Sequence, residues 1–438
     1  AGDIIMEING KDMAQGDRTP NELTSYVSDN LRGDPGTTCV LKLERPTADS
    51  TYIPMELKIT RGTIRTNPVP YYGMVDKNIG YIAISTFAIE GCSKDIKKAL
   101  IELKQQGATS IVLDLRGNGG GLLSEAVNVV NFFVPKGKEI VVTKGKIKQA
   151  GSTYKTSNEP IDMEIPLTVL VDGATASAAE IVSGSLQDLD RAVIVGNRTY
   201  GKGLVQVPRE LPYNSSMKVT TAKYYIPSGR CIQAIDYAKR NADGSVARIP
   251  DSLTTVFHTA AGREVRDGGG IRPDVEVKAE RFPNIMFYLL NDDMIFDYAT
   301  QYCIKHPNIG EVKDFSVTDA DYDDFKQMLK KRNFTYDRQS EKSLKNLKEI
   351  AEFEGYMEGA SEEFAALEKK LTHNLDHELN RFSKQIRKAI AEEIVKRHYF
   401  QRGVILERMK DDADLTKAIE TLKDKEGYTK ILSVPADK

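Results

Sequence analysis

The feature that most constrains the fold lies between residues 78 and 200, where apolar segments alternate with amphipathic ones. IGYIAIST, SIVLDLR, PLTVLVDG and AVIVGNRT have the character of strands, and SIVLDLR shows the low polar alternation of a strand buried on both faces. Between them lie SKDIKKALIELKQQG, LLSEAVNVVNFFV and SAAEIVSGSLQDL, which have the character of helices. Strands that alternate with helices predict an α/β layer fold built on crossover connections.

The segments on either side of this region differ from it. Residues 1–61 are rich in short strands, such as GDIIMEING with its turn at Asn9-Gly10 and the alternating TCVLKLERP and YIPMELKITR. After a connector, TNPVPYYG, the α/β region adds a β segment, MKVTTAKYYIPSG, and closes with DGGGIRPDVEV. Beyond about residue 281, Leu, Glu, Lys and Ala recur with helical periodicity. The sequence therefore predicts domains at residues 1–61, 62–280 and 281–438.

Composition excludes several classes of function. With 61 Lys and Arg against 63 Asp and Glu in 438 residues, no general basic field favours a nucleic-acid partner. No apolar run approaches the roughly 18–20 residues that a membrane helix needs. The chain opens on AGDIIMEING without a Met, so we expect a leader upstream. Its four cysteines form no CxxC pair, which predicts neither a metal site nor a disulfide framework and leaves their redox state open.

All five histidines lie outside residues 78–210, so a Ser-His-Asp triad would need its base from a distant segment. His373 and His377 stand one helical turn apart, in reach of a common metal ion. The glutamate of an HExxH site is missing, however, and a charged helix surrounds them, so a solvated helix face is the better interpretation.

A glycine cluster, DLRGNGGGL, follows a predicted strand and precedes a predicted helix. It matches neither GxGxxG, because Leu122 stands at the last glycine position, nor a Walker loop. Several glycines still bring backbone N–H groups close to a ligand at the positive end of a helix. Such groups hold a developing oxyanion as well as they hold a phosphate. A tight turn alone accounts for one or two of these glycines but less readily for four.

Ser177 lies in VDGATASAAEIVSG, between a predicted strand and a predicted helix. A serine at a helix start is most often an N-cap. Here Ala176, Ala178 and Ala179 leave space around the hydroxyl, and the N–H group of Ala178 points the same way as the new helix. The alternative to capping is therefore a nucleophile. Thr175 is interpreted as a local turn or capping residue.

A nucleophilic serine needs a base, and Lys202 in YGKGLVQ is the residue best placed to supply one. It follows a strand parallel to the one that precedes Ser177, and the carboxyl ends of neighbouring parallel strands meet at one edge of the sheet. A lysine held among apolar groups loses its proton more readily, which suits it to act as a general base in a Ser-Lys arrangement. Taken alone, Lys202 is more simply a loop lysine at the surface, and only its pairing with Ser177 favours a catalytic role.

In this order and spacing, LDLRGNGGGL, TASAAEI and RTYGKGLVQ resemble the carboxyl-terminal processing proteases, the tail-specific Ser-Lys endopeptidases of peptidase family S41. The resemblance extends over about residues 1–280 and is similar only in outline beyond them. It implies a crotonase-like (ClpP-like) α/β core, a partial PDZ domain before it and an α-helical C-terminal domain after it. AGDIIMEINGKDM and GDPGTTCVLKLER resemble the later part of a PDZ domain.

The resemblance also implies roles for individual residues. It makes Ser177 the nucleophile, Lys202 the general base and Gln206 the glutamine that orients this base. The backbone N–H groups of Ala178 and of Gly120 would form the oxyanion hole. No cofactor or metal ion is implied.

The family further implies protein substrates with apolar C-terminal tails, selected through the PDZ domain, and a periplasmic or cell-envelope location. The helical domain would bind an adaptor protein or mediate self-association. The PDZ strand and loop that grip a terminal carboxylate would precede AGDII, so we expect the chain to be a fragment of a longer protein, and strand addition by these residues is doubtful.

Two other functions remain open at this stage. A crotonase-like enzyme that processes acyl thioesters would use the same backbone oxyanion donors, although a PDZ segment and a Ser/Lys pair argue against it. A non-catalytic PDZ scaffold would keep the fold, although Ser177, Lys202 and Gln206 are all in place.

Overall fold

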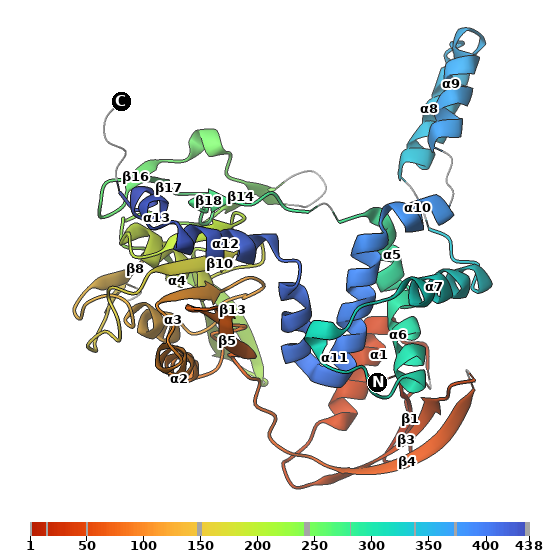
Figure 1. The fold of residues 1–438 in the computed structure, drawn as a ribbon, viewed down its shortest axis with the longest axis horizontal. Helices are drawn as coiled ribbons and strands as arrows, with labels where there is room; N and C mark the ends of the chain where they lie inside the picture. Colours follow the sequence, from red (N-terminus) through yellow and green to blue (C-terminus); the bar gives the residue numbers. More distant parts are fainter. Residues whose placement is uncertain are drawn as a thin grey trace. The chain divides into compact units, whose positions relative to one another are not determined.

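The computed structural model describes residues 2–14, 16–49, 51–146, 151–240, 246–280, 282–336, 339–371 and 375–433. The chain forms two compact units, each made of two separate stretches. We call the first, Ala1–Ile64 with Glu280–Lys410, the helical unit, and the second, Arg65–Ala279 with Asp411–Lys438, the core unit. Figure 1 colours both along the sequence.

The core unit is built on a six-stranded sheet in the order β18-β11-β10-β7-β6-β5. All its strands are parallel except β5, which pairs with β6 antiparallel. The strands are β5 (Tyr71–Asp76), β6 (Ile79–Ala83), β7 (Ser110–Asp114), β10 (Leu167–Val171), β11 (Val193–Gly196) and β18 (Val275–Glu276). The α/β prediction is thus confirmed, and the strands before Ser177 and Lys202 are neighbours, as expected.

Three helices connect the parallel strands: α2 (Cys92–Gln105), α3 (Leu123–Val130) and α4 (Ala178–Asp188). They pack on alternate strand residues, among them Ile111, Leu113 and Val169, in the largest hydrophobic cluster of the core unit. Every residue of α4 is buried, which explains why its sequence is so rich in small and apolar side chains. The helix that begins after Ser177 is therefore held rigidly inside the unit.

The other face of this sheet is covered by a segment from the far end of the chain. Val112, Leu170 and Val195 alternate with the residues of the main cluster, and each is fully buried. Helix α12 (Ala413–Lys423) packs on β7, β10 and β11, and α13 (Lys425–Ile431) follows it. The predicted boundaries assign residues 281–438 to one helical domain. The structure instead places residues from Asp411 onward in the core unit, because a parallel sheet needs cover on both faces.

The rest of the core unit consists of a second sheet and two hairpins. The sheet has the order β12-β13-β8-β9, and the hairpins pair β14 with β15 and β16 with β17. These strands are β8 (Glu139–Gly145), β9 (Ser152–Lys155), β12 (Leu204–Leu211), β13 (Ser215–Tyr225), β14 (Ile235–Arg240), β15 (Val246–Arg248), β16 (Val256–His258) and β17 (Glu264–Arg266). Strand β12 begins directly after the loop of Lys202, so this second sheet helps to position the lysine.

The helical unit contains a four-stranded antiparallel sheet, β2-β1-β3-β4, and helix α1 (Pro20–Leu31). The strands are β1 (Ile4–Ile8), β2 (Lys11–Asp12), β3 (Thr38–Pro46) and β4 (Tyr52–Thr60). β1 and β2 form a hairpin whose two turn residues, Asn9 and Gly10, have φ of 51° and 77°. Asn-Gly is the pair that tolerates two positive φ angles best, so the predicted turn is confirmed.

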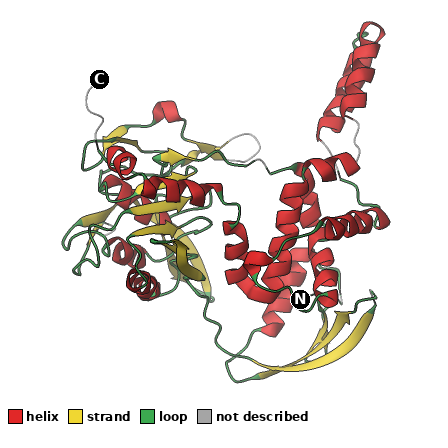
Figure 2. Cartoon of the chain, viewed as in Figure 1, coloured by secondary structure: helices red, strands yellow, loops and turns green. Residues whose placement is uncertain are grey.

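The remainder of the helical unit is helical, as the composition predicts (Figure 2). Its helices are α5 (Asn284–Asn291), α6 (Met294–Lys305), α7 (Asp319–Lys331), α8 (Gln339–Phe353), α9 (Met357–Leu371), α10 (Leu375–Arg381) and α11 (Ser383–Met409). Ile390 and Ile394 of α11 pack with Phe325 of α7 in one hydrophobic cluster. Within the described residues no helix has the length and apolar character needed to cross a bilayer.

Candidate active site

Ser177 lies at the turn between β10 and α4 and has a strained backbone, with φ 57° and ψ −117°. Residues other than glycine rarely adopt this conformation, and where they do, the strain is held by the surrounding structure and clusters at functional sites. A strained strand-to-helix turn is also the device that exposes a nucleophilic serine in other hydrolases. The turn is thus an observation that favours the nucleophile over a simple cap.

The surrounding structure that holds Ser177 centres on Glu180, which is fully buried in the first turn of α4. Its Oε2 atom accepts the backbone N–H of Ser177 and the backbone N–H of Lys202, each over 2.8 Å. Its Oε1 atom accepts the N–H of Gly201 over 2.7 Å and the hydroxyl of Thr199 over 2.5 Å. One carboxylate therefore joins the turn of Ser177 to the loop of Lys202.

The environment of Glu180 also affects its ionisation. Burial raises the pKa of Glu180, and the hydrogen bonds from Thr199 and from the backbone of Lys202, Ser177 and Gly201 act in the opposite direction. Glu180 is not among the site residues predicted from the sequence. The sequence does contain a pattern that points to it, because a serine followed three positions later by a glutamate is typical of a capping box.

A second buried group, the hydroxyl of Tyr224 on β13, connects the same two residues. It lies within hydrogen-bond distance of the carbonyl oxygen of Lys202 and 3.2 Å from that of Ser177. Burial raises the pKa of Tyr224 well above its ordinary value, so the hydroxyl keeps its proton and donates. Gln233 adds a third support, since its Oε1 accepts the N–H of Gly203 over 2.7 Å.

The structure thus brings Ser177 and Lys202 together through their backbones. Lys202 is half-buried, as a lysine between two buried glycines would be. Among the residues that the structure describes, no hydrogen bond joins the Ser177 hydroxyl to the Lys202 ammonium group. Contacts of this kind are often loose in an unliganded site and tighten when substrate binds.

Gln206 lies apart from this arrangement. It is exposed on β12, where it pairs with Thr220, and a bulge separates it from Val205. Within the described part of the chain it makes no hydrogen bond to Lys202. Its orienting role therefore stays a prediction, and Gln233 is the glutamine that contacts the lysine loop in this structure.

The glycine loop, residues 117–121, lies directly against the turn of Ser177. A Cβ atom at Gly120 would lie 2.8 Å from the Cβ of Ser177 and 2.8 Å from the nitrogen of Ala178, and Gly120 has a φ of 94°. Both the contact and the φ angle require glycine. The backbone N–H of Ala176 also donates to the carbonyl oxygen of Asn118 over 2.9 Å. The predicted proximity of the glycine cluster to Ser177 is therefore present.

Only some of the backbone N–H groups of the glycine loop and the Ser177 turn are free to bind an oxyanion. In the described structure the N–H groups of Ala178 and Gly119 have no hydrogen-bond partner. The N–H of Gly120 donates to Oδ1 of Asn118 over 2.9 Å. Ala178 therefore offers the free donor that an oxyanion hole needs, whereas Gly120 must first release Asn118 to do so.

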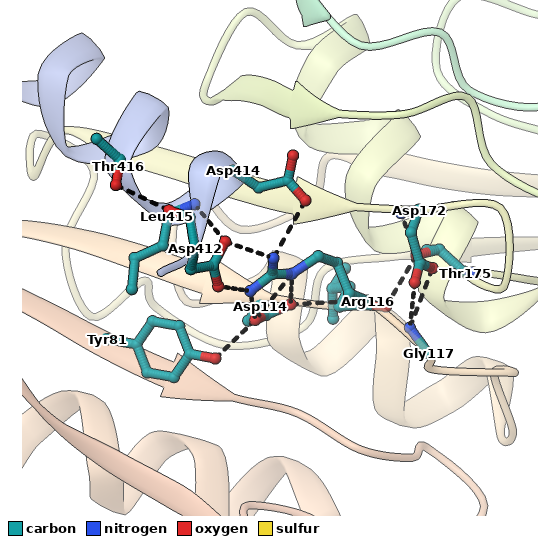
Figure 3. Close-up of polar contacts among 11 residues, drawn as sticks. Tyr81, Asp114, Arg116, Gly117, Asp172, Thr175, Asp412, Asp414, Leu415 and Thr416 are labelled. Atoms are coloured by element: carbon teal, nitrogen blue, oxygen red, sulfur yellow. Dashed lines mark hydrogen bonds and ion pairs between the residues drawn. The ribbon is translucent and has the colours of Figure 1, made fainter. Parts of the chain in front are cut away.

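Thr175 has the local role expected of it. It is fully buried, and its hydroxyl lies 2.9 Å from the carbonyl oxygen of Leu115 and 3.0 Å from the carboxylate of Asp172. Asp172 in turn accepts the N–H groups of Gly117 and Thr175, as Figure 3 shows. This carboxylate joins the glycine loop to the turn that leads to Ser177.

The described residues contain no cluster of His, Cys, Asp and Glu side chains suited to a metal ion. His373, one of the pair weighed above, lies outside the described residues. All four cysteines have free thiols, two of them buried, Cys39 and Cys92. The site brings together the strained turn of Ser177, the loop of Lys202 and backbone N–H donors, and a serine, a lysine and such donors are the parts that nucleophilic acyl transfer requires.

The residues that form this site lie in a region that matches a known protein family. Residues 78–239 match peptidase family S41, and residues 285–422 match the C-terminal helical domain of a probable PDZ-protease. The carboxy-terminal-processing protease of Bartonella bacilliformis is 38% identical over 241 residues, which are 54% of this chain and 52% of that protein. The carboxyl-terminal-processing protease of a Picosynechococcus species is 38% identical over 230 residues, 52% of each chain.

The chain spans about half the length of these curated relatives. Among solved structures, the photosystem II D1 C-terminal processing protease is similar at 29% identity, covering 65% of either chain with a TM-score of 0.38.

Proposed function

This chain belongs to peptidase family S41 through its residues 78–239, and on that basis we propose that it is a serine endopeptidase that cleaves protein substrates near their C-termini. Ser177 is the nucleophile and Lys202 is the general base. The observation that carries the proposal is the position of Glu180, whose single Oε2 atom accepts a backbone N–H from each of these residues.

In the reaction that we propose, the neutral amine of Lys202 takes the proton of the Ser177 hydroxyl as Oγ attacks the scissile carbonyl carbon. The carbonyl oxygen becomes an oxyanion, which the backbone N–H of Ala178 and one from the glycine loop stabilise. Lys202 then gives its proton to the leaving amine, and the peptide bond breaks to leave an acyl ester on Ser177. Water hydrolyses this ester by the same steps, and Gln206 orients the lysine.

The segments before and after the core residues in the sequence would select the substrate. Residues 1–61 act as a partial PDZ domain that favours apolar C-terminal tails, and the core has the crotonase-like arrangement. The match of the helical segment to a PDZ-protease supports this organisation. The helical domain binds an adaptor or a second copy of the chain, and the enzyme works in the periplasm or cell envelope.

The test is cleavage of a reporter protein with an apolar C-terminal tail by the full chain. Ser177→Ala and Lys202→Ala each abolish cleavage while circular dichroism shows an unchanged fold. Lys218→Ala, a lysine exposed on β13 where this strand pairs with Pro208 of β12, is the matched control and keeps full activity. If Lys202→Ala keeps near-normal turnover at neutral pH, the assignment of the base is wrong.

A second comparison tests the substrate class. A reporter with a charged tail should be cleaved more slowly than the apolar one by the same enzyme preparation. Mass spectrometry of the products shows whether the new ends lie near the C-terminus. Equal rates for both tails contradict selection by apolar tails without touching the proposal for Ser177.

A further inference from the structure

Arg116, which directly precedes the glycine loop, is held by three carboxylates from two distant parts of the sequence (Figure 3). Asp114, at the end of β7, accepts from Nε over 3.0 Å and from Nη2 over 2.6 Å. Asp412 accepts from Nη1 over 2.9 Å and from Nη2 over 2.7 Å, and Asp414 accepts from Nη1 over 3.1 Å. Because a guanidinium group has five N–H donors, these contacts engage all of them.

This cluster is largely removed from solvent. The Arg116 side chain is 22% exposed, and that of Asp412 only 8%. Although burial acts against the charged form, the carboxylates of Asp114 and Asp412 raise the pKa of Arg116 above its usual range. A buried guanidinium group keeps its position while carboxylates compensate its charge, and it is destabilised when that compensation is removed.

Asp412 is firmly placed by its own segment. It is the N-cap of α12, and its Oδ1 also accepts the backbone N–H of Leu415 over 3.0 Å. Leu415, Ala418 and Leu422 of that helix are buried, where α12 packs on the second face of the sheet. The carboxylate that reaches Arg116 is therefore anchored by a whole helix rather than by a mobile side chain.

What Arg116 holds is one end of the glycine loop. The next residue, Gly117, donates its N–H to Asp172 over 3.0 Å, and Gly120 contacts the Ser177 turn. At the far end of the loop, the carbonyl oxygen of Gly120 accepts the N–H of Phe87 over 2.9 Å. The position of the loop, and of any oxyanion donor on it, thus depends on Arg116 at one end.

We propose that Asp412 is a positioning residue of this active site: acting through Arg116, it fixes the glycine loop beside Ser177. The segment that begins at Asp411 is then a working part of the catalytic unit and not only a brace for the sheet. The effect on catalysis rests on the proposed function, whereas the effect on the loop does not.

The test compares two variants of the full chain. Asp412→Ser keeps a hydroxyl that can cap α12 but is too short to engage two guanidinium nitrogens. Tyr428→Phe is the matched control. The Tyr428 hydroxyl accepts the backbone N–H of Leu167 and donates to its carbonyl oxygen. Its loss therefore loosens the segment that begins at Asp411 as well, but at the start of β10, whereas Asp172 and the glycine loop lie at the other end of this strand. Both variants are measured under conditions in which they are fully folded.

Two readouts are needed, hydrogen exchange by mass spectrometry over residues 115–122 and the separate kcat and KM for a tailed reporter. We expect Asp412→Ser to speed exchange in the loop and to lower kcat by about tenfold to a hundredfold with KM within about twofold. Tyr428→Phe should leave both readouts near their wild-type values.

Unchanged loop exchange in Asp412→Ser overturns the proposal, and so does a Tyr428→Phe variant that shows the same losses. Faster loop exchange with unchanged kcat also overturns it, because the loop would then be held but not used. A wild-type chain that cleaves no reporter contradicts the proposed function instead, and the exchange readout still decides whether Asp412 fixes the loop.

Discussion

Ser177 and Lys202 donate their backbone N–H groups to the same atom, Oε2 of Glu180, each over 2.8 Å. This shared acceptor fixes the separation of two loops that follow two neighbouring strands. It also explains how the strained backbone of Ser177 persists, since the N–H of Ser177 is hydrogen-bonded to the fully buried side chain of Glu180.

Glu180→Gln tests this relationship. All four donors need an acceptor, and the amide nitrogen of glutamine faces two of them as another donor, so we expect a loss of about 1–3 kcal/mol in the free energy of unfolding. Turnover per folded molecule should fall by at least about tenfold, because both reacting side chains shift.

Glu125→Gln is the control for that variant. Glu125 is also buried in the first turn of a helix, α3. It accepts two backbone N–H groups from the start of α2, that of Gly91 over 3.0 Å and that of Ser93 over 2.8 Å. It should lose a similar free energy of unfolding and keep its kcat. Equal losses of kcat in both variants contradict a specific role for Glu180.

Gly120→Ala tests the contact between the glycine loop and the nucleophile turn. A Cβ there meets the Ala176 carbonyl oxygen at 2.7 Å and the nitrogen of Ala178 at 2.8 Å, so the loop must move away and activity should be lost. Gly119→Ala is its neighbour and control, because a Cβ at Gly119 meets no atom within 4 Å. A Gly120→Ala enzyme with wild-type activity would show that the loop takes no part in catalysis.

Asp414→Asn gives a pH-dependent change in stability. Burial raises the pKa of Asp414, and the nearby Arg116 offsets this only in part, because three carboxylates face one guanidinium group. A carboxyl group with a raised pKa in the folded state favours folding only while it is protonated. The free energy of unfolding therefore falls as pH rises from the unfolded pKa, about 3.9, through the folded pKa.

The asparagine variant should therefore be more stable than wild type at pH 8 and equal to it at about pH 3.5. Denaturant unfolding at several pH values measures the difference. A variant that is less stable than wild type at pH 8 would mean that the third carboxylate is fully compensated in the folded state.

We expect opposite results from substitutions at Gln233, which contacts the lysine loop, and at Gln206, which does not. Gln233→Ala leaves the N–H of Gly203 without its acceptor and should cost about 1–2 kcal/mol of unfolding free energy along with activity. Gln206 is exposed on β12, so Gln206→Ala should leave the unfolding free energy unchanged and lower only kcat. An unchanged kcat in Gln206→Ala would remove the orienting role predicted for that residue.

The sequence predicted the parts of this fold that depend on local pattern. Buried apolar runs predict β7 and β10, and the rule that the carboxyl ends of parallel strands share an edge predicts that Ser177 lies near Lys202. Glu180 is not among the predicted site residues although its spacing from Ser177 is that of a capping box, because a cap and a nucleophile are treated as alternatives for the serine.

Other features had no local signal. Tyr224 and Gln233 meet the site only through the pairing of the second sheet, which single-residue patterns do not encode. The periodicity of residues 413–423 predicts an apolar helix face but not the surface that it covers. For this reason the sequence predicts that residues from Asp411 onward belong with the helices, whereas the structure places them in the core unit.

The central claim, that Lys202 activates Ser177, is tested most directly by covalent labelling with a fluorophosphonate, followed by mass spectrometry of the digested protein. The account predicts that the folded wild-type chain is labelled on Ser177 and that Lys202→Met, folded to the same extent, is not. Labelling of Ser177 at the wild-type rate in Lys202→Met would contradict it.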